Sequence, residues 1–276
     1  MGDQVAREGA DLARAEAVVA RWRRLAEDGD GLVRMAEGVS DAQIDTWPAH
    51  VPEHVRVLAR AAAWYFVADF EGFGFLEPDN FDGALEHLLG PRQTWWALHA
   101  DGAAHTWFAD IDAAGGWGRV LNIDEDHDVE FLAPDVIAWL AYLADCAEAA
   151  RVVARGGGAY RLPVRLLPSE ERGAGATGTA APPDAADVFA DLMYHGGEFF
   201  EPWHGPDAVS LTAAQAARTG DPDLVRAAAG LAPDERVVDM RTMPLFSHLP
   251  YASRHGERIE RLLGGAVLMI RHGSGG

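Results

Sequence analysis

The densest group of possible metal ligands in the sequence is the acidic run Asp124–Asp128. Carboxylates recur at alternate positions from Asp124, and Asp135 stands at the twelfth position, as in a calcium-binding loop. Such a loop needs glycine at its sixth position, but Val129 occupies that position here. Aspartate runs are common in solvated turns. We therefore interpret the acidic run as a hairpin turn and expect no bound metal.

The tripeptide Arg-His-Gly occurs twice, at Arg254–Gly256 and at Arg271–Gly273. Because the second copy follows the apolar segment 267–270, it is similar to the nucleophile motif of histidine phosphatases, in which a histidine among arginines attacks phosphate. In that family the motif opens the domain, whereas here three residues follow Gly273. We therefore do not expect His272 to be a nucleophile.

A third candidate is a segment with metal-ligating side chains at His195, Glu198, Glu201 and His204. Metal-binding His and Glu normally share one helical face, four residues apart. Two glycines and one proline within this segment disfavour a continuous helix. A loop with incidental polar side chains is the interpretation we favour.

The sequence also lacks residues that common catalytic motifs require. All 23 basic residues are arginine, which excludes a Schiff-base lysine and a Walker-type phosphate loop. The single cysteine, Cys146, can form neither an intramolecular disulfide nor a thiolate zinc site, and its helical context favours a buried thiol. We therefore expect a chain without catalytic residues, cofactor or metal.

Charge is the strongest feature of the composition. The chain has a formal net charge of −20, and residues 1–155 hold 28 acidic and 12 basic side chains against 15 and 11 in the remainder. Such a surface repels nucleic acids and anionic membranes and attracts basic proteins, although net charge also serves solubility. One cysteine, no signal-peptide pattern and no apolar stretch of membrane-spanning length predict a reduced, cytoplasmic environment.

Hydrophobic spacing predicts the elements that would position these residues. Helices are expected at 11–27, from Val51 through an apolar stripe that includes Tyr65 and Phe66, and after Ala133–Asp135. Strand-like segments are expected at 95–100, 105–111, 119–123 and 128–132, the first two flanking the hairpin signal Asp101-Gly102. Farther on, the sequence predicts a helix capped by Asp221 and strands at 236–240 and 266–270.

These elements divide the chain into three parts. Residues 1–155 would form one domain of helices and strands. Residues 156–184 would form an edge strand near 160–167 and a linker, and residues 185–276 a smaller α/β unit.

Residues 47–150 resemble the SUKH superfamily of Smi/Knr-type domains. Four segments carry the likeness in order: Trp47–Glu53, Trp96–Asp112, Gly118–Asp126 and Val129–Asp135. The sequence departs from the family pattern after the second helix, where Asp69–Gly72 replaces the usual Asn-Gly. The resemblance implies an α+β domain with a mostly antiparallel sheet packed with helices over residues 1–155. Bacterial members are largely inferred immunity proteins that bind and neutralise toxin domains, often nucleases, whereas fungal relatives act as scaffolds.

We therefore expect a cytoplasmic immunity protein whose partner is a basic toxin domain. Its acidic turns would face basic side chains of the partner, and Trp117, which lies between glycines, would either anchor the partner or fold back onto the sheet. The candidate partner-binding residues are Asp110, Asp112, Trp117, Asp124, Glu125, Asp126 and Asp128.

Two other functions stay open from the sequence. A regulatory scaffold without a toxin partner could use the same surface. A hydrolase could occupy the C-terminal unit, around His195–His204 or His272.

Overall fold

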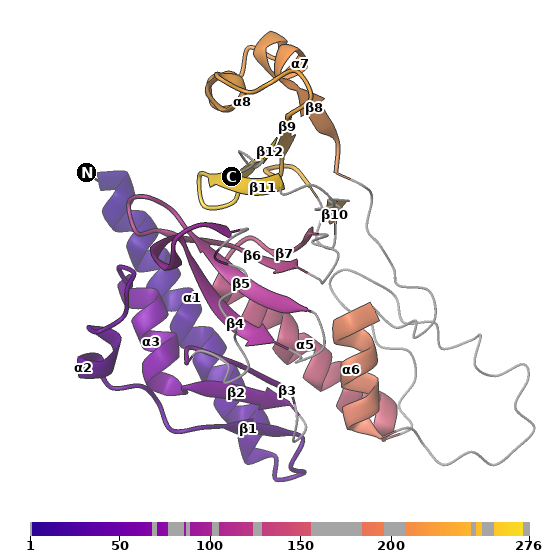
Figure 1. Ribbon diagram of the computed structural model, residues 1–276. Helices are drawn as coiled ribbons and strands as arrows, with labels where there is room; N and C mark the ends of the chain where they lie inside the picture. Colours follow the sequence, from indigo (N-terminus) through magenta and orange to yellow (C-terminus); the bar gives the residue numbers. More distant parts are fainter. Residues whose placement is uncertain are drawn as a thin grey trace, which may run out of the picture. The chain divides into compact units, whose positions relative to one another are not determined.

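A computed structural model shows an α+β protein, which confirms the expected fold class (Figure 1). The structure describes residues 2–67, 71–76, 86, 89–100, 105–123, 129–155, 184–195, 208–243, 247–249 and 257–272. Within these residues, helices accompany three sheets in which every paired strand is antiparallel.

The chain forms two compact units, each built from three separate segments. The first, the helical unit, comprises Met1–Val39, Val57–Gly74 and Ile137–Trp203. The second, the two-sheet unit, comprises Ser40–Arg56, Phe75–Val136 and His204–Gly276.

Among its described residues, the helical unit contains one short sheet. Its helices are α1 (Gly2–Glu27), most of α5 (Val136–Ala154), α6 (Ala185–His195) and the C-terminal part of α3 (Glu53–Ala61). Its strands are β1 (Val33–Met35), β2 (Trp64–Val67) and β3 (Glu71–Gly74), in the order β1-β2-β3.

The core of the helical unit centres on Trp22, which is fully buried. Its indole N–H donates to the carbonyl oxygen of Leu140 in α5 over 3.0 Å. Its ring meets Tyr65 edge-on, with 5.2 Å between ring centroids, and the Tyr65 hydroxyl donates to the Leu58 carbonyl oxygen at 2.7 Å. Trp22 therefore connects α1 with α5 and with β2.

A buried arginine fastens α5 to the end of α1. The Arg151 guanidinium contacts Asp28 at 2.8 Å and Asp30 at 2.7 Å, and it also donates to the Leu25 carbonyl oxygen at 2.7 Å. Burial acts to raise the pKa of Asp30, but hydrogen bonds from Arg151 and from the Leu32 amide outweigh it and hold that pKa below its usual range.

The two-sheet unit takes its name from two antiparallel sheets. The first has the order β10-β7-β6-β5-β4, with β4 (Trp95–Ala100), β5 (Thr106–Ile111), β6 (Trp117–Ile123), β7 (Val129–Ala133) and β10 (Ser247–Leu249). The second has the order β11-β12-β9-β8, with β8 (Ser210–Thr212), β9 (Arg236–Asp239), β11 (Glu257–Leu262) and β12 (Val267–His272).

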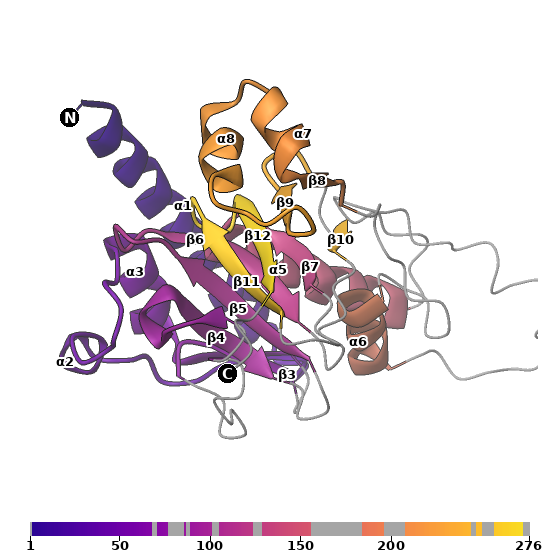
Figure 2. The same cartoon turned by 45° about the horizontal axis from the view of Figure 1, so that its top comes forward.

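Among the described residues, the short helices that lie wholly within this unit are α2 (Asp41–Ile44), the 3-10 helix η1 (Arg92–Thr94), α7 (Ala213–Arg218) and α8 (Pro222–Ala228). Figure 2 shows α7 and α8 beside β8 and β9, which they contact. The Asp221 carboxylate accepts hydrogen bonds from the amides of Asp223 and Leu224, and Pro222 fills the first helical position. The predicted cap of this helix is therefore confirmed.

Both sheets contribute to one hydrophobic core. Phe108, Leu121 and Phe131 of the first sheet lie in the same buried cluster as Val238 and Leu268 of the second. Residues of the C-terminal region therefore complete the core formed by strands β4 to β7.

The predicted strands of the central region match the structure closely. Strands β4, β5, β6 and β7 begin and end within two residues of the expected bounds, and they pair in sequence order. The helix expected after Ala133–Asp135 is α5. The edge strand expected at 160–167 lies outside the described residues.

One helix prediction is wrong at its end. Tyr65 and Phe66 do not continue the apolar stripe of α3, which ends at Ala61; they lie in β2. Residues 64–67 are all aromatic or β-branched and therefore suit a strand, where they pair with β1 and β3.

The division into units also differs from the expected one. Instead of a separate unit at 185–276, β10 pairs with β7, and the C-terminal sheet shares the core of the central strands. The C-terminal sheet is antiparallel, so this region belongs to the α+β class as well.

Candidate partner-binding site

A cleft of about 560 Å³ opens in the two-sheet unit beside the β11–β12 hairpin. Its lining comes from three parts of the chain: the residues around η1, the end of β5 with the turn that follows, and the hairpin. The charged side chains of the lining are those of Glu86, Asp110, Asp112, Glu260 and Arg261. The lining also includes Leu263, an exposed apolar side chain.

A buried ion pair forms the floor of this cleft. The side chains of Asp110 on β5 and Arg261 on β11 are only 3 % and 4 % exposed, and the Arg261 Nε–H donates to the Asp110 carboxylate. The guanidinium also donates to the carbonyl oxygens of Leu89 at 2.7 Å and Thr94 at 3.1 Å. Burial raises the pKa of the Asp110 carboxyl above its usual range, and the neighbouring Arg261 opposes that rise. The pair therefore cross-links the two sheets.

Asp112 shapes the turn between β5 and β6. Its Oδ1 accepts hydrogen bonds from the amides of Ala114 and Gly116, both at 2.8 Å, and its own amide donates to the Gly116 carbonyl oxygen at 2.9 Å. Gly115 has φ 82°, a conformation that glycine adopts without strain. The Asp112 carboxylate accepts hydrogen bonds from two backbone amides. Among the described residues, no guanidinium contacts this carboxylate and balances its charge.

The β11–β12 hairpin turns through three residues with positive φ: Leu263 (55°), Gly264 (62°) and Gly265 (72°). A Cβ on Gly118 of β6 would collide with the carbonyl oxygen of Gly264, and the Arg119 amide donates to that oxygen at 3.1 Å. The close backbone contact therefore requires glycine at 118. Leu263 itself is 44 % exposed at the tip.

The structure corrects two of the predicted site residues. Asp110 cannot face a partner, because its carboxylate is buried against Arg261. Trp117 folds back onto the sheet: it is 7 % exposed, its ring lies 5.9 Å from that of Trp96, and its indole N–H donates to the His50 carbonyl oxygen at 2.9 Å. Trp117 is therefore not an exposed anchor.

The other predicted residues stay predictions. Asp112 is half-buried and lines the cleft. Asp124, Glu125, Asp126 and Asp128 lie outside the described residues.

Sequence reasoning missed Arg261 and Leu263. The partner of Arg261 is 151 residues away in the chain, so no local pattern indicates the ion pair. Leu263 did carry a signal, because a leucine before two glycines stands between two strand-forming segments and marks an apolar hairpin tip.

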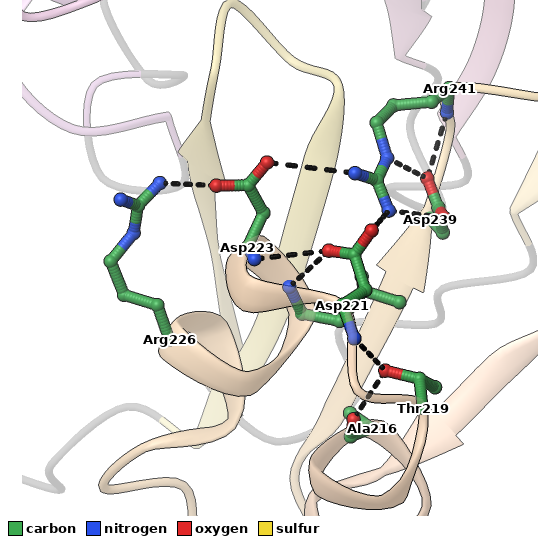
Figure 3. Close-up of polar contacts among 8 residues, drawn as sticks. Ala216, Thr219, Asp221, Asp223, Arg226, Asp239 and Arg241 are labelled. Atoms are coloured by element: carbon green, nitrogen blue, oxygen red, sulfur yellow. Dashed lines mark hydrogen bonds and ion pairs between the residues drawn. The ribbon is translucent and has the colours of Figure 1, made fainter.

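A second group of charges surrounds Arg241 in the same unit (Figure 3). Arg241 contacts Asp239 at 2.8 Å, Asp221 at 3.0 Å and Asp223 at 3.5 Å. Hydrogen bonds from the Leu224 amide and from Arg241 lower the pKa of Asp221, and the Arg241 guanidinium lowers the pKa of Asp239. Because Asp221 caps α8 and all three carboxylates contact an arginine of the same unit, we assign the group to structure.

Most residues of the remaining chemical candidates lie outside the part of the chain that the structure describes. Among the described residues, no group of three or more His, Cys, Asp or Glu side chains could hold a metal ion. His195 ends α6 and His272 ends β12, whereas residues 196–204 and 254–256 lie outside the described part of the chain. Of the helices that the structure describes, none combines the length and apolarity needed to cross a membrane.

We expect Cys146 to be chemically inert in the folded protein. Its side chain is fully buried in α5, and burial raises the pKa of the thiol to about 12, so almost no thiolate is present at neutral pH. A colorimetric thiol reagent should label the native protein very slowly and the urea-unfolded protein stoichiometrically. Rapid, complete labelling of the native protein would contradict this placement of α5.

No known family model matches the chain, and no curated protein or solved structure matches it either. The likeness of residues 47–150 to the SUKH superfamily therefore stays a prediction from the sequence.

Proposed function

We propose that this chain is a non-enzymatic, SUKH-type immunity protein that neutralises a basic toxin domain by binding it. The observation that carries the proposal is the cleft of the two-sheet unit, whose lining includes both the carboxylate of Asp112 and an exposed apolar side chain, Leu263. An apolar contact beside an acidic one suits the surface of a basic protein.

The charge balance of the whole chain supports the same partner class. The sequence has 43 acidic residues but only 23 arginines. Several arginines are already engaged within the fold, among them Arg21, Arg56, Arg151, Arg241 and Arg261. The surplus carboxylates would attract a cationic protein and accelerate its association.

The mechanism is steric and electrostatic blockade. The acidic surface would bring the toxin domain close, and the bound chain would cover the basic residues with which a nuclease holds its substrate phosphates. Such a partner acts inside the cell, so the proposal includes a cytoplasmic location, to which the single, buried thiol is suited.

The experiment starts with the full chain as bait in an extract of the native host, at low and at high salt. A recovered basic protein is then produced on its own and assayed for nuclease or other toxic activity, with and without one equivalent of the chain. We expect loss of toxic activity and an association rate that falls steeply with salt. A partner without toxic activity would instead favour a regulatory scaffold.

Charge variants then test the predicted acidic turn. The triple change Asp124→Asn, Asp126→Asn and Asp128→Asn should lower the low-salt association rate about tenfold. The control removes as many charges from exposed acids of the helical unit, with Glu16→Gln, Glu27→Gln and Glu37→Gln. Equal rates for the two triple variants would mean that net charge, and not this turn, guides the partner.

A further inference from the structure

Leu263 adopts a backbone conformation that its side chain does not favour. A bulky residue with φ 55° is uncommon, and glycine or asparagine would hold the same turn with less strain. The side chain is nevertheless 44 % exposed, so burial in the unit's own core explains only part of its presence. Strained backbone conformations cluster at sites that clamp ligands.

The hairpin tip is held firmly in place. The Arg119 amide donates to the Gly264 carbonyl oxygen at 3.1 Å, and Gly264 lies directly against Gly118. On β11, just before the tip, Arg261 donates hydrogen bonds to Asp110, Leu89 and Thr94. A partner would therefore meet Leu263 already ordered, with little conformational entropy to lose.

The cleft beside Leu263 has a surplus of negative charge. Arg261 neutralises Asp110, and Glu260 contacts Arg271 at 2.8 Å. Among the described residues Asp112 has no cationic partner, since its carboxylate accepts its hydrogen bonds from the backbone amides of Ala114 and Gly116. Ile259, Leu262 and Met269 also line the cleft and make it partly apolar.

We propose that this cleft receives a cationic side chain of a partner protein, at Asp112, while an adjacent apolar side chain of the partner packs against Leu263. The proposal rests on the function proposed above and names the contact point within it. An arginine next to an aromatic or aliphatic residue fits best, because its stem can cover the apolar lining while its guanidinium reaches the carboxylate.

The probe for this contact is the capped dipeptide N-acetyl-Phe-Arg-amide, titrated into the full chain and followed by amide NMR. We expect shifts at Asp112, Ala113 and Leu263, saturating at millimolar concentration. N-acetyl-Phe-Glu-amide, which has the opposite charge, should leave these signals unchanged. Shifts that the two probes share, shifts confined to other regions, or no shifts would overturn the proposal.

Two variants separate binding from folding. Asp112→Asn keeps the oxygen that accepts the two amide hydrogen bonds but removes the charge, and Leu263→Asn suits the positive φ. Each should weaken the dipeptide about fivefold, which corresponds to roughly 1 kcal/mol, while the urea midpoint of Leu263→Asn stays the same or rises. The control is Val209→Asn, which changes a 70 % exposed valine elsewhere in the unit and should leave binding unchanged.

These outcomes can be told apart from failure of the proposed function. If a toxin domain is recovered but binds the Leu263→Asn and Asp112→Asn variants as tightly as the unchanged chain, the contact point is wrong and the immunity function stands. If the dipeptide binds at the cleft but no toxin domain is recovered, the contact point stands and the immunity function falls.

Discussion

Replacing Arg261 by methionine is expected to lower the free energy of unfolding by about 3–5 kcal/mol. The substitution leaves the buried Asp110 carboxylate without its cation and removes the donors to the carbonyl oxygens of Leu89 and Thr94. Asp110→Asn should lower the free energy of unfolding by a similar amount, because it leaves the Arg261 guanidinium buried without its anion. Urea unfolding followed by far-ultraviolet circular dichroism measures both.

The double variant makes the test specific for the ion pair. Replacing both Arg261 by methionine and Asp110 by asparagine removes both charges, so it should cost clearly less than the sum of the two single changes. Arg218→Met, which changes an exposed arginine of α7, is the control and should alter stability by less than about 0.5 kcal/mol. Additive single changes, or losses as small as that of Arg218→Met, would show that the pair does not cross-link the sheets.

Trp22→Ala is expected to lower the free energy of unfolding of the helical unit by about 3–5 kcal/mol. The indole is fully buried and contacts Leu140 of α5 and Tyr65 of β2, so the truncation opens a cavity that these packed elements cannot easily close. Trp22→Phe refills most of that volume and loses mainly the hydrogen bond to the Leu140 carbonyl oxygen, so it should cost about 1–2 kcal/mol.

The order of these losses is the informative result. We expect Trp22→Ala to be the least stable, then Trp22→Phe, then the control Val152→Ala, which shortens a 37 % exposed side chain of α5. Thermal unfolding monitored by circular dichroism gives the same ranking independently of urea. A Trp22→Ala protein as stable as Val152→Ala would mean that α1 does not pack against α5 through this residue.

The sequence by itself determined the local elements of this protein. The strand-like segments on both sides of Asp101-Gly102 predicted β4 and β5, because this dipeptide suits the tight turn of a hairpin between two strands. Asp221 and Pro222 predicted the start of α8, because a helix end exposes amides that a carboxylate can accept. These signals come from residues within a few positions of one another, so composition and spacing suffice to find them.

The candidate site was only partly visible in this way. The acidic turn around Asp112 could be predicted, because it lies next to the strands that define it. Whether Asp110 and Trp117 are exposed could not be predicted, since the sequence of β5 and β6 does not say what covers each face of the sheet.

Only the tertiary structure decided which distant segments meet. It placed β10 beside β7, made the C-terminal sheet part of the central core, and gave Asp110 an arginine from 151 residues farther along the chain. It also placed Trp64–Val67 in a strand, because β1 and β3 lie on the two sides of this segment and pair with its backbone. Pairing and burial of this kind depend on neighbours that are close in space but distant in sequence, so spacing along the chain does not encode them in a readable form.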